Sequence, residues 1–163
     1  CSLEVCLHVL NSVLVREHQL VKLKVLRQYL DYSVVSSLHF EGLRGIKVLD
    51  FSYNNIGWNG MKHIFSEIIR TKNVTVRRIY LNRNAKIVEE NVSELYSMME
   101  NMPMVRRLSL DFEVDETKRR FDEYCENRFS IASKMAIHLC YAVYMKNIPL
   151  PIDLVRRIHL AIK

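Results

Sequence analysis

The sequence has few of the residues that break or cross-link a chain. Its 163 residues include only four glycines and three prolines, which leaves little room for flexible linkers or low-complexity tracts. No apolar stretch reaches the length of about 18 residues that a membrane span needs, so we expect no membrane partner. The four cysteines, at positions 1, 6, 125 and 140, form no C-x-x-C pair and no disulfide-framework spacing. Such cysteine usage is typical of a reducing, intracellular compartment.

The motifs of the common catalytic and cofactor sites are also missing. The sequence contains no glycine-rich phosphate loop, and no serine or cysteine stands in a nucleophile elbow. The pairs Cys6-x-His8 and His138-x-Cys140 contain metal-ligand types, but side chains two positions apart on a helix diverge. We therefore expect no enzymatic activity, no metal, no cofactor and no small-molecule substrate.

Positive charge is in excess. Twenty-four Lys and Arg against 18 Asp and Glu give a net charge of +6 and an isoelectric point near 9.2. The basic residues recur along the chain instead of forming a tail, with arginine pairs at 77–78, 106–107, 119–120 and 156–157. Such a balance favours an acidic partner, either a protein or a nucleic acid. The length favours one domain with a core of ordinary size.

A short apolar pattern occurs nearly three times. It reads apolar-x-x-apolar-x-apolar, and its central residues Leu49, Ile79 and Leu108 stand 30 and 29 residues apart. A fixed period of this size indicates a solenoid, in which each unit buries its apolar face only against its neighbours. The alternating part of each pattern predicts a strand. Asn54 and Asn84 follow the first two strands, where a buried amide would hydrogen-bond the backbone of adjacent turns.

Helical stretches follow the first two predicted strands. Apolar residues at i, i+3, i+4 and i+7 begin at Met61, which is the spacing of one helix face, and a similar apolar set follows at Val92, Leu95, Met98 and Met99. Asn59 and Asn91 are the predicted N-caps. The predicted fold class is therefore α/β, with a curved parallel sheet lined on its outside by helices.

The order of these residues resembles the leucine-rich-repeat family. The pattern LxxLxLxxNxI followed by a helix, at a period of about 28 to 30 residues, is similar to the long, ribonuclease-inhibitor-like subclass. Residues 49–68 carry the resemblance most fully, with Gly60 at the family's usual helix-start glycine. The second unit has Asn91 in place of that glycine, and the third keeps only its strand. The helical C-terminal end also resembles the tropomodulin C-terminal repeat domain, an actin-binding cap. The resemblance implies a short leucine-rich-repeat solenoid that acts as a binding surface.

The two ends of the chain are predicted to cap the repeats. Residues 1–43 form the predicted N-terminal cap, with a helix over the first 32 residues and an edge strand over Val34–Phe40. An alternative interpretation places a further repeat over Leu20–Leu30, where the same apolar spacing occurs. The repeats occupy residues 44–112, and residues 113–163 form a helical C-terminal cap in the same folded unit.

Residues 148–158 have two interpretations. Their Pro-Leu-Pro segment resembles the start of an F-box and the LPLPxxL segment of a SOCS box, although both matches are incomplete. This resemblance implies a substrate receptor of a ubiquitin ligase. The alternative is a two-helix cap with Pro151 in the first turn of a helix. Because the chain starts at Cys1 and not at Met, we also expect a fragment or a processed product of a longer protein.

The candidate binding site is the concave strand face, opposite the helices. Adjacent strands lie about 4.8 Å apart, so Arg78 and Arg107 are expected to form a ladder of guanidinium groups beside Tyr80. Trp58, expected in a turn beside Tyr53, is a candidate anchor on the rim. The alternative is that the polar side chains only solvate an open sheet and that Trp58 packs on the next turn. The predicted partner-binding residues are Asp50, Ser52, Tyr53, Trp58, Arg78, Tyr80, Asn82, Arg107, Ser109 and Asp111.

These observations favour a non-catalytic protein–protein interaction module. We expect a scaffold subunit of a larger assembly, which binds a protein partner through the concave strand face. A basic subunit associated with RNA or a ribonucleoprotein is an alternative that depends on the charge. A ubiquitin-ligase substrate receptor is a second alternative, which depends on residues 148–158. Composition does not separate these three functions.

Overall fold

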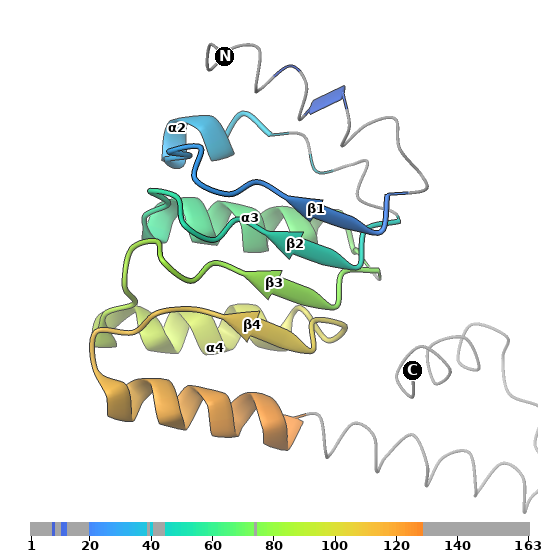
Figure 1. Cartoon of the computed structure of the whole chain (residues 1–163). Helices are drawn as coiled ribbons and strands as arrows, with labels where there is room; N and C mark the ends of the chain where they lie inside the picture. The colour runs from blue at the N-terminus through green and yellow to red at the C-terminus, as the bar shows by residue number, and fades with distance from the viewer. Residues whose placement is uncertain are drawn as a thin grey trace, which may run out of the picture. The chain divides into compact units, whose positions relative to one another are not determined.

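The computed structural model describes residues 8, 11–12, 20–38, 40, 45–73 and 75–128 of the chain. Its centre is a four-stranded parallel sheet in which each strand pairs with the next one along the chain (Figure 1). The predicted α/β class with a parallel sheet is therefore confirmed. The strands are β1 (Lys22–Lys24), β2 (Val48–Asp50), β3 (Arg78–Tyr80) and β4 (Arg107–Ser109).

Helices α3 and α4 lie behind one face of the sheet in Figure 1 and connect successive strands. Helix α3 connects β2 to β3, and α4 connects β3 to β4 after a short 3-10 turn. The bounds are α2 (Tyr32–Val35), α3 (Trp58–Arg70), the 3-10 turn η2 (Glu89–Asn91) and α4 (Val92–Glu100), and residues 115–128 are also helical.

The central residues of the repeat pattern lie side by side in the sheet. Leu49, Ile79 and Leu108 are register partners on neighbouring strands, and Leu23 continues the row on β1. All four side chains are buried. Burial of an aliphatic side chain stabilises a fold by about 1.5–3 kcal/mol, so this row contributes to the stability of all four repeats.

The predicted helix face packs against the sheet. Helix α3 has buried side chains at the i, i+3, i+4 and i+7 positions, while Ser66 on the other side of the helix is exposed. This amphipathic spacing stabilises the helix through its packing more than through its intrinsic propensity. The buried residues of the face are Met61, Ile64, Phe65 and Ile68.

The helix predicted over the first 32 residues is wrong from Lys22 onward. Residues Lys22–Lys24 form strand β1, which pairs in parallel with β2. The alternative interpretation, a further repeat over Leu20–Leu30, matches this strand. The backbone N–H groups of Gln28 and Leu30 donate to the side-chain oxygen of Asn54, at 2.9 and 3.3 Å. These contacts with the next repeat outweigh the helical propensity of the segment.

The edge strand predicted over Val34–Phe40 is also wrong. Val34 and Val35 end the short helix α2, and both are buried. The Asp31 side chain caps this helix by accepting hydrogen bonds from the Val34 N–H at 3.1 Å and the Ser33 hydroxyl at 2.6 Å. A capped turn that buries two valines satisfies the backbone locally and overrides the β propensity of these residues.

Two predicted helix caps differ from the structure. Helix α3 begins at Trp58, so Asn59 lies inside the helix and Gly57 occupies the N-cap position. Asn91 does occupy the N-cap position of α4, but its side chain makes no capping hydrogen bond. The reason is that the preceding 3-10 turn gives Asn91 a helical backbone, with φ −90° and ψ −9°, whereas a capping side chain needs an extended one.

The C-terminal part is described only in its first portion. The contacts of the chain divide it into two compact units, Cys1–Lys118 and Arg119–Lys163. The prediction that residues 113–163 cap the repeats within one folded unit is not tested and stays a prediction. The segment 148–158 lies outside the described residues. In the part that the structure describes, no helix combines the length and the apolar character needed to cross a bilayer.

Candidate binding face on the sheet

The strand face is the side of the sheet that points away from α3 and α4. The in-register pairing places its side chains in rows that run across the strands, and the backbone pairing continues beyond the strand ends. The first row is Lys22, Val48, Arg78 and Arg107; the second is Lys24, Asp50, Tyr80 and Ser109; the third is Leu26, Ser52, Asn82 and Asp111.

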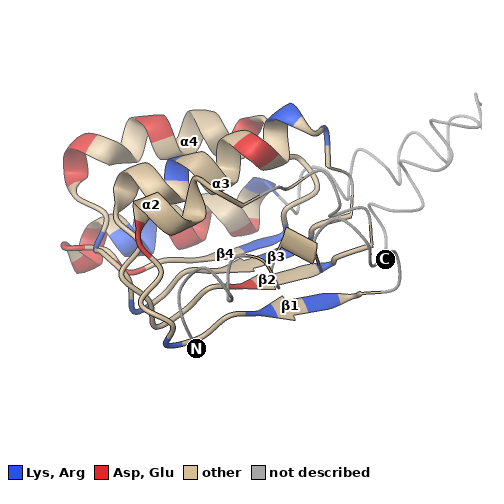
Figure 2. Ribbon diagram, turned by 90° about the horizontal axis from the view of Figure 1, so that it is seen from above, with Lys and Arg blue, Asp and Glu red and all other residues tan. Residues whose placement is uncertain are grey.

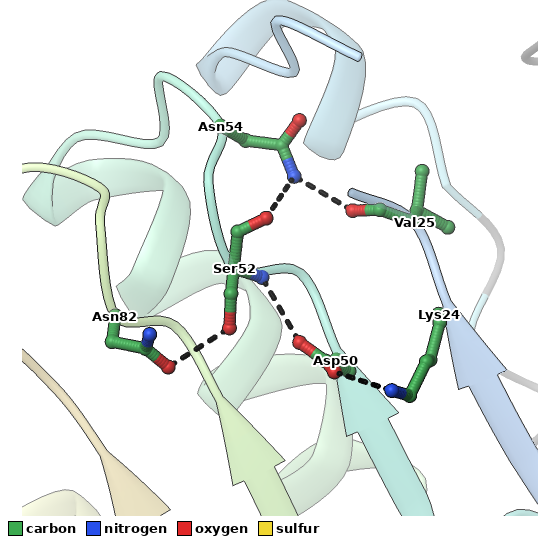
Figure 3. Close-up of polar contacts among 6 residues, drawn as sticks. All are labelled: Lys24, Val25, Asp50, Ser52, Asn54 and Asn82. Carbon is green, nitrogen blue, oxygen red and sulfur yellow. Dashed lines mark hydrogen bonds and ion pairs between the residues drawn. The ribbon is translucent and has the colours of Figure 1, made fainter. Parts of the chain in front are cut away.

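A polar network crosses the middle of the strand face (Figure 3). The Asp50 carboxylate lies 3.6 Å from the Lys24 ammonium and accepts a hydrogen bond from the Ser52 N–H at 3.3 Å. The Ser52 hydroxyl in turn donates to the Asn82 side-chain oxygen at 2.9 Å. Asp50 and Ser52 are only 9% and 4% exposed. Asp50 and Ser52, both predicted to bind a partner, therefore connect neighbouring strands of the face and present little surface to a ligand.

Cations surround this network. Lys22, Lys24, Arg78 and Arg107 are all exposed on the strand face, and Figure 2 shows the basic residues on β1, β3 and β4. The charge of Lys24 is the main cause that lowers the pKa of Lys22, and Arg78 lowers it further while Asp50 opposes the shift. A lysine whose pKa is lowered by its neighbours lies in a positive potential. The strand face therefore favours an anionic ligand.

The two arginines of the predicted guanidinium ladder lie in one row of the strand face. Arg78 and Arg107 are register partners on adjacent strands. The Arg107 guanidinium carbon lies 5.8 Å from the centre of the Tyr80 ring, and Arg27 lies 5.3 Å from the centre of the Tyr53 ring. At these distances the positive group is attracted to the ring face. Arginine and tyrosine thus lie together as they do at protein-binding hot spots.

An open pocket of about 410 Å³ lies at the β1 side of the strand face. Its lining includes five predicted residues and three that the sequence analysis missed, because β1 was expected to be helical. The signal that could have found the missed residues is the apolar spacing over Leu20–Leu30, which repeats the pattern of the later strands. The predicted residues are Asp50, Ser52, Tyr53, Tyr80 and Asn82, and the missed ones are Lys22, Lys24 and Leu26.

Trp58 does not belong to the strand face. It is the first residue of α3, and its indole N–H donates to the Glu94 carboxylate of α4 at 3.2 Å. The Lys62 ammonium lies 5.9 Å from the ring centre and 3.4 Å from the same carboxylate group. The predicted position in a turn beside Tyr53 is therefore wrong, because helix α3 begins one residue earlier than its expected cap. Trp58 joins the helices of neighbouring repeats.

Asp111 and Ser109 lie at the β4 side. The Asp111 carboxylate accepts a hydrogen bond from the Arg83 N–H at 2.6 Å, so it closes the turn of the preceding repeat. Ser109 is half-buried on β4, in register with Tyr80. Of these two predicted binding residues, Asp111 is therefore already hydrogen-bonded to the backbone of the chain itself.

The described residues outside the face provide little reactive chemistry. Among them, no group of three or more His, Cys, Asp or Glu side chains could hold a metal ion. Burial raises the pKa of the Cys125 thiol to about 11, so the thiol stays protonated at neutral pH and is a weak nucleophile. The strand face itself offers charge, hydrogen bonds and aromatic surface, which are the means of recognition.

Comparisons with known proteins bear on the fold. No protein-family model matches the sequence, and no curated protein matches it significantly. Among solved structures, the chain is similar to one titled "Leiomodin-1 Actin-Binding Site 2 (ABS2)", with 13% sequence identity and a TM-score of 0.67. The match covers 88% of this chain and 83% of that chain. At this identity the likeness shows the fold alone, an α/β arrangement consistent with leucine-rich repeats, and it does not support the ribonuclease-inhibitor-like subclass.

Proposed function

We propose that this chain is a non-catalytic interaction module that binds a protein partner through the strand face, as a scaffold subunit of a larger assembly. The observation that carries the proposal is the convergence of Arg78, Arg107 and Tyr80 with Lys22 and Lys24 on one open face of the sheet. Because the sheet fixes the backbone that carries these cations and the aromatic ring, binding a partner has to order only their side chains.

The similar solved structure adds to this support. By its title it is an actin-binding site, so at least one chain of this fold binds a protein. A shared fold does not transfer a partner, and the proposal therefore depends on the side chains of this chain. The ribonuclease-inhibitor-like subclass and the solenoid with helical caps are further parts of the proposal.

The test is a comparison of two triple variants of the tagged full chain. The first carries Arg78→Ala, Tyr80→Ala and Arg107→Ala on the strand face. The matched control carries Ser66→Ala, Ser93→Ala and Glu100→Ala, which are exposed helix positions. Affinity purification after nuclease treatment, followed by mass spectrometry, identifies the partners. We expect the first variant to lose them and the control to keep them, while circular dichroism shows both folded. Equal recovery of the same proteins by both variants would rule the strand face out.

Association with RNA is the second candidate function. The net charge of +6 and the basic rows on the strands favour it. Phosphate contacts would make the affinity fall steeply with salt, with a slope of about −0.7 per contact for a single strand. A salt titration against a single-stranded RNA measures this slope directly, and a flat response argues against the candidate. The ubiquitin-ligase hypothesis depends on residues 148–158 and is tested by loss of an adaptor when residues 148–163 are deleted.

A further inference from the structure

We infer that the strand face recognises an extended acidic peptide segment that crosses the strands, with two acidic residues four positions apart and an apolar residue midway between them. This inference rests on the proposed function and specifies the chemistry of the partner. It comes from the first row of the face, where exposed cations stand on either side of a buried valine: Lys22, then Val48, then Arg78 and Arg107.

The spacing of the row defines the spacing of the ligand. Neighbouring strands lie about 4.8 Å apart, so the positions of Lys22, Arg78 and Arg107 fall at about 0, 10 and 14 Å along the row. An extended peptide advances about 3.3 Å per residue, and alternate side chains point to the same side. Residues i, i+2 and i+4 therefore reach positions at about 0, 7 and 13 Å. The first lies at Lys22, the second near Val48, and the third between Arg78 and Arg107.

The middle position is apolar. Val48 is buried, with 4% of its surface exposed, and the long side chains of Lys22 and Arg78 stand on either side of it in the row. The aliphatic stems of lysine and arginine present apolar surface below their charged ends. An apolar side chain at i+2 would rest on these stems while the acidic residues beside it meet the charged ends.

The charges of the row require an anionic ligand. The pKa of Lys22 is lowered chiefly by Lys24 and also by Arg78, and the Asp50 carboxylate lies 3.6 Å from the Lys24 ammonium. A carboxylate placed at Lys22 would relieve the repulsion among the cations. The pocket of about 410 Å³ beside Lys22 and Lys24 leaves room for the side chain that carries it.

An acidic peptide fits this face better than an RNA strand does. A phosphodiester chain carries a charge at every nucleotide, and one of those charges would lie over the apolar gap at Val48. The Arg107 guanidinium carbon lies 5.8 Å from the centre of the Tyr80 ring, so a base that stacked on that side of the ring would have to displace it. A peptide can place acidic side chains at the cations of this row and an apolar side chain between them.

The experiment is a selection of random 12-residue displayed peptides on the immobilised full chain. We expect the enriched peptides to share an acidic-x-apolar-x-acidic pattern and to lose about ten-fold or more in affinity for a chain that carries Arg78→Glu and Arg107→Glu. The matched control, Lys86→Glu, reverses an exposed charge on the loop after β3 and should leave the affinity within about two-fold. Changing the second acidic residue of an enriched peptide to lysine should restore binding to the Arg78→Glu and Arg107→Glu chain.

The outcomes separate this inference from the proposed function. Enriched peptides that need the strand face but lack acidic residues would overturn the inference and leave the proposed function standing. Peptides that bind the Arg78→Ala, Tyr80→Ala, Arg107→Ala chain as well as the unchanged chain would overturn both. A 12-nucleotide single-stranded RNA that binds more tightly than every selected peptide, with a steep salt slope, would overturn the inference in favour of nucleic acid.

Discussion

The first repeat, which begins with β1, and the second repeat, which begins with β2, share one backbone geometry, although their sequences differ. Strands β1 and β2 pair in register, but the second repeat continues into the 13-residue helix α3 and the first into the four-residue helix α2. At the turn after the strand the second repeat has Asn54 and the first has Gln28. Asn54 bonds to the backbone of both repeats, whereas the Gln28 side chain bonds to Leu26 of its own repeat. The comparison teaches that the second repeat provides the turn contacts that the first repeat lacks.

The corners of the repeats also show this shared geometry. Arg27, Tyr53 and Arg83 each stand four residues after the central apolar residue of their strand, and all three have a left-handed backbone, with φ of 57°, 59° and 60°. A side chain at such a position costs about 1–2 kcal/mol relative to the ordinary backbone. The strain persists because the flanking turns are fixed by hydrogen bonds, among them the one from the Arg83 N–H to Asp111.

The largest expected effect comes from Asn54→Ala. Its side chain accepts from two N–H groups of the first repeat and donates to backbone oxygens of both repeats. Loss of these bonds leaves half-buried backbone groups without partners, and we expect the free energy of unfolding to fall by about 3 kcal/mol. Denaturant unfolding of the full chain, followed by circular dichroism, measures the change.

Substitutions of Asn84 and Gln28, which stand at the same turn position in the neighbouring repeats, sharpen this prediction. Asn84 bonds to the N–H of Ile56 and to two backbone oxygens, so Asn84→Ala should cost about 2 kcal/mol. Gln28→Ala removes one exposed bond to Leu26 and should change stability by less than about 0.5 kcal/mol. Equal costs for Asn54 and Gln28 would contradict the idea that the second repeat specifies the first.

This dependence explains which parts of the fold could be predicted. The positions of Leu49, Ile79 and Leu108 follow from local periodicity, and the structure places them as predicted. The structure of residues 20–30 could not be predicted in the same way, because it depends on Asn54, which bonds to them from 24 to 29 positions away. Local propensity indicated a helix, but the contacts with the neighbouring repeat decide the outcome.

The second prediction concerns the close packing at Gly60, in the first turn of helix α3. A Cβ atom at Gly60 would stand 2.7 Å from Ile56 Cγ2 and 3.7 Å from the Cα of Tyr32 in α2. Ile56 is fully buried and has little room to move, so Gly60→Ala should destabilise the chain by about 2 kcal/mol. Thermal unfolding of the variant measures the change.

Gly57 provides the matched control for Gly60. A Cβ atom there would meet nothing within 4 Å, and its φ of −77° suits alanine. Gly57→Ala should therefore be neutral or stabilise by up to about 1 kcal/mol, since alanine restricts the unfolded chain. If the two variants lost stability equally, the close approach of Gly60 to Ile56 would not be what excludes a side chain at this position.

The third prediction reverses the usual effect of glycine. At Arg83, with φ of 60°, glycine should be more stable than alanine by about 1 kcal/mol, because glycine adopts this backbone without strain. At the exposed helix position Ser66 the order should reverse, with alanine the more stable by about 1 kcal/mol. Four variants measured by denaturant unfolding give both differences. The same sign at the two sites would show that the corner is not strained.

The binding face could be predicted in part. Strand alternation correctly indicated that Arg78 and Arg107 are neighbours, because strand direction and spacing follow from the repeat. The burial of Asp50 and Ser52 could not be predicted, since it arises from side chains on the strands beside them, including Lys24 of the unrecognised β1. The position of Trp58 depended on a helix start, and helix boundaries are set by details of the cap that a pattern does not contain.

The smallest expected effect is a pH dependence within the first repeat. Hydrogen bonds from the Ser33 hydroxyl and the Val34 N–H lower the pKa of Asp31 below its ordinary value of 3.8. A carboxylate with a lowered pKa in the folded state stabilises the fold above its unfolded-state pKa, and the contribution is lost as the pH falls through the folded-state pKa. Asp31→Ala should therefore be less stable than the unchanged chain at pH 7, and the difference should shrink below pH 3.8.

Asp31→Asn is the control, because asparagine also caps helices but does not titrate. Denaturant unfolding at a series of pH values measures the difference, and a gap that stays constant into the acid range would mean that the Asp31 charge does not stabilise the start of α2.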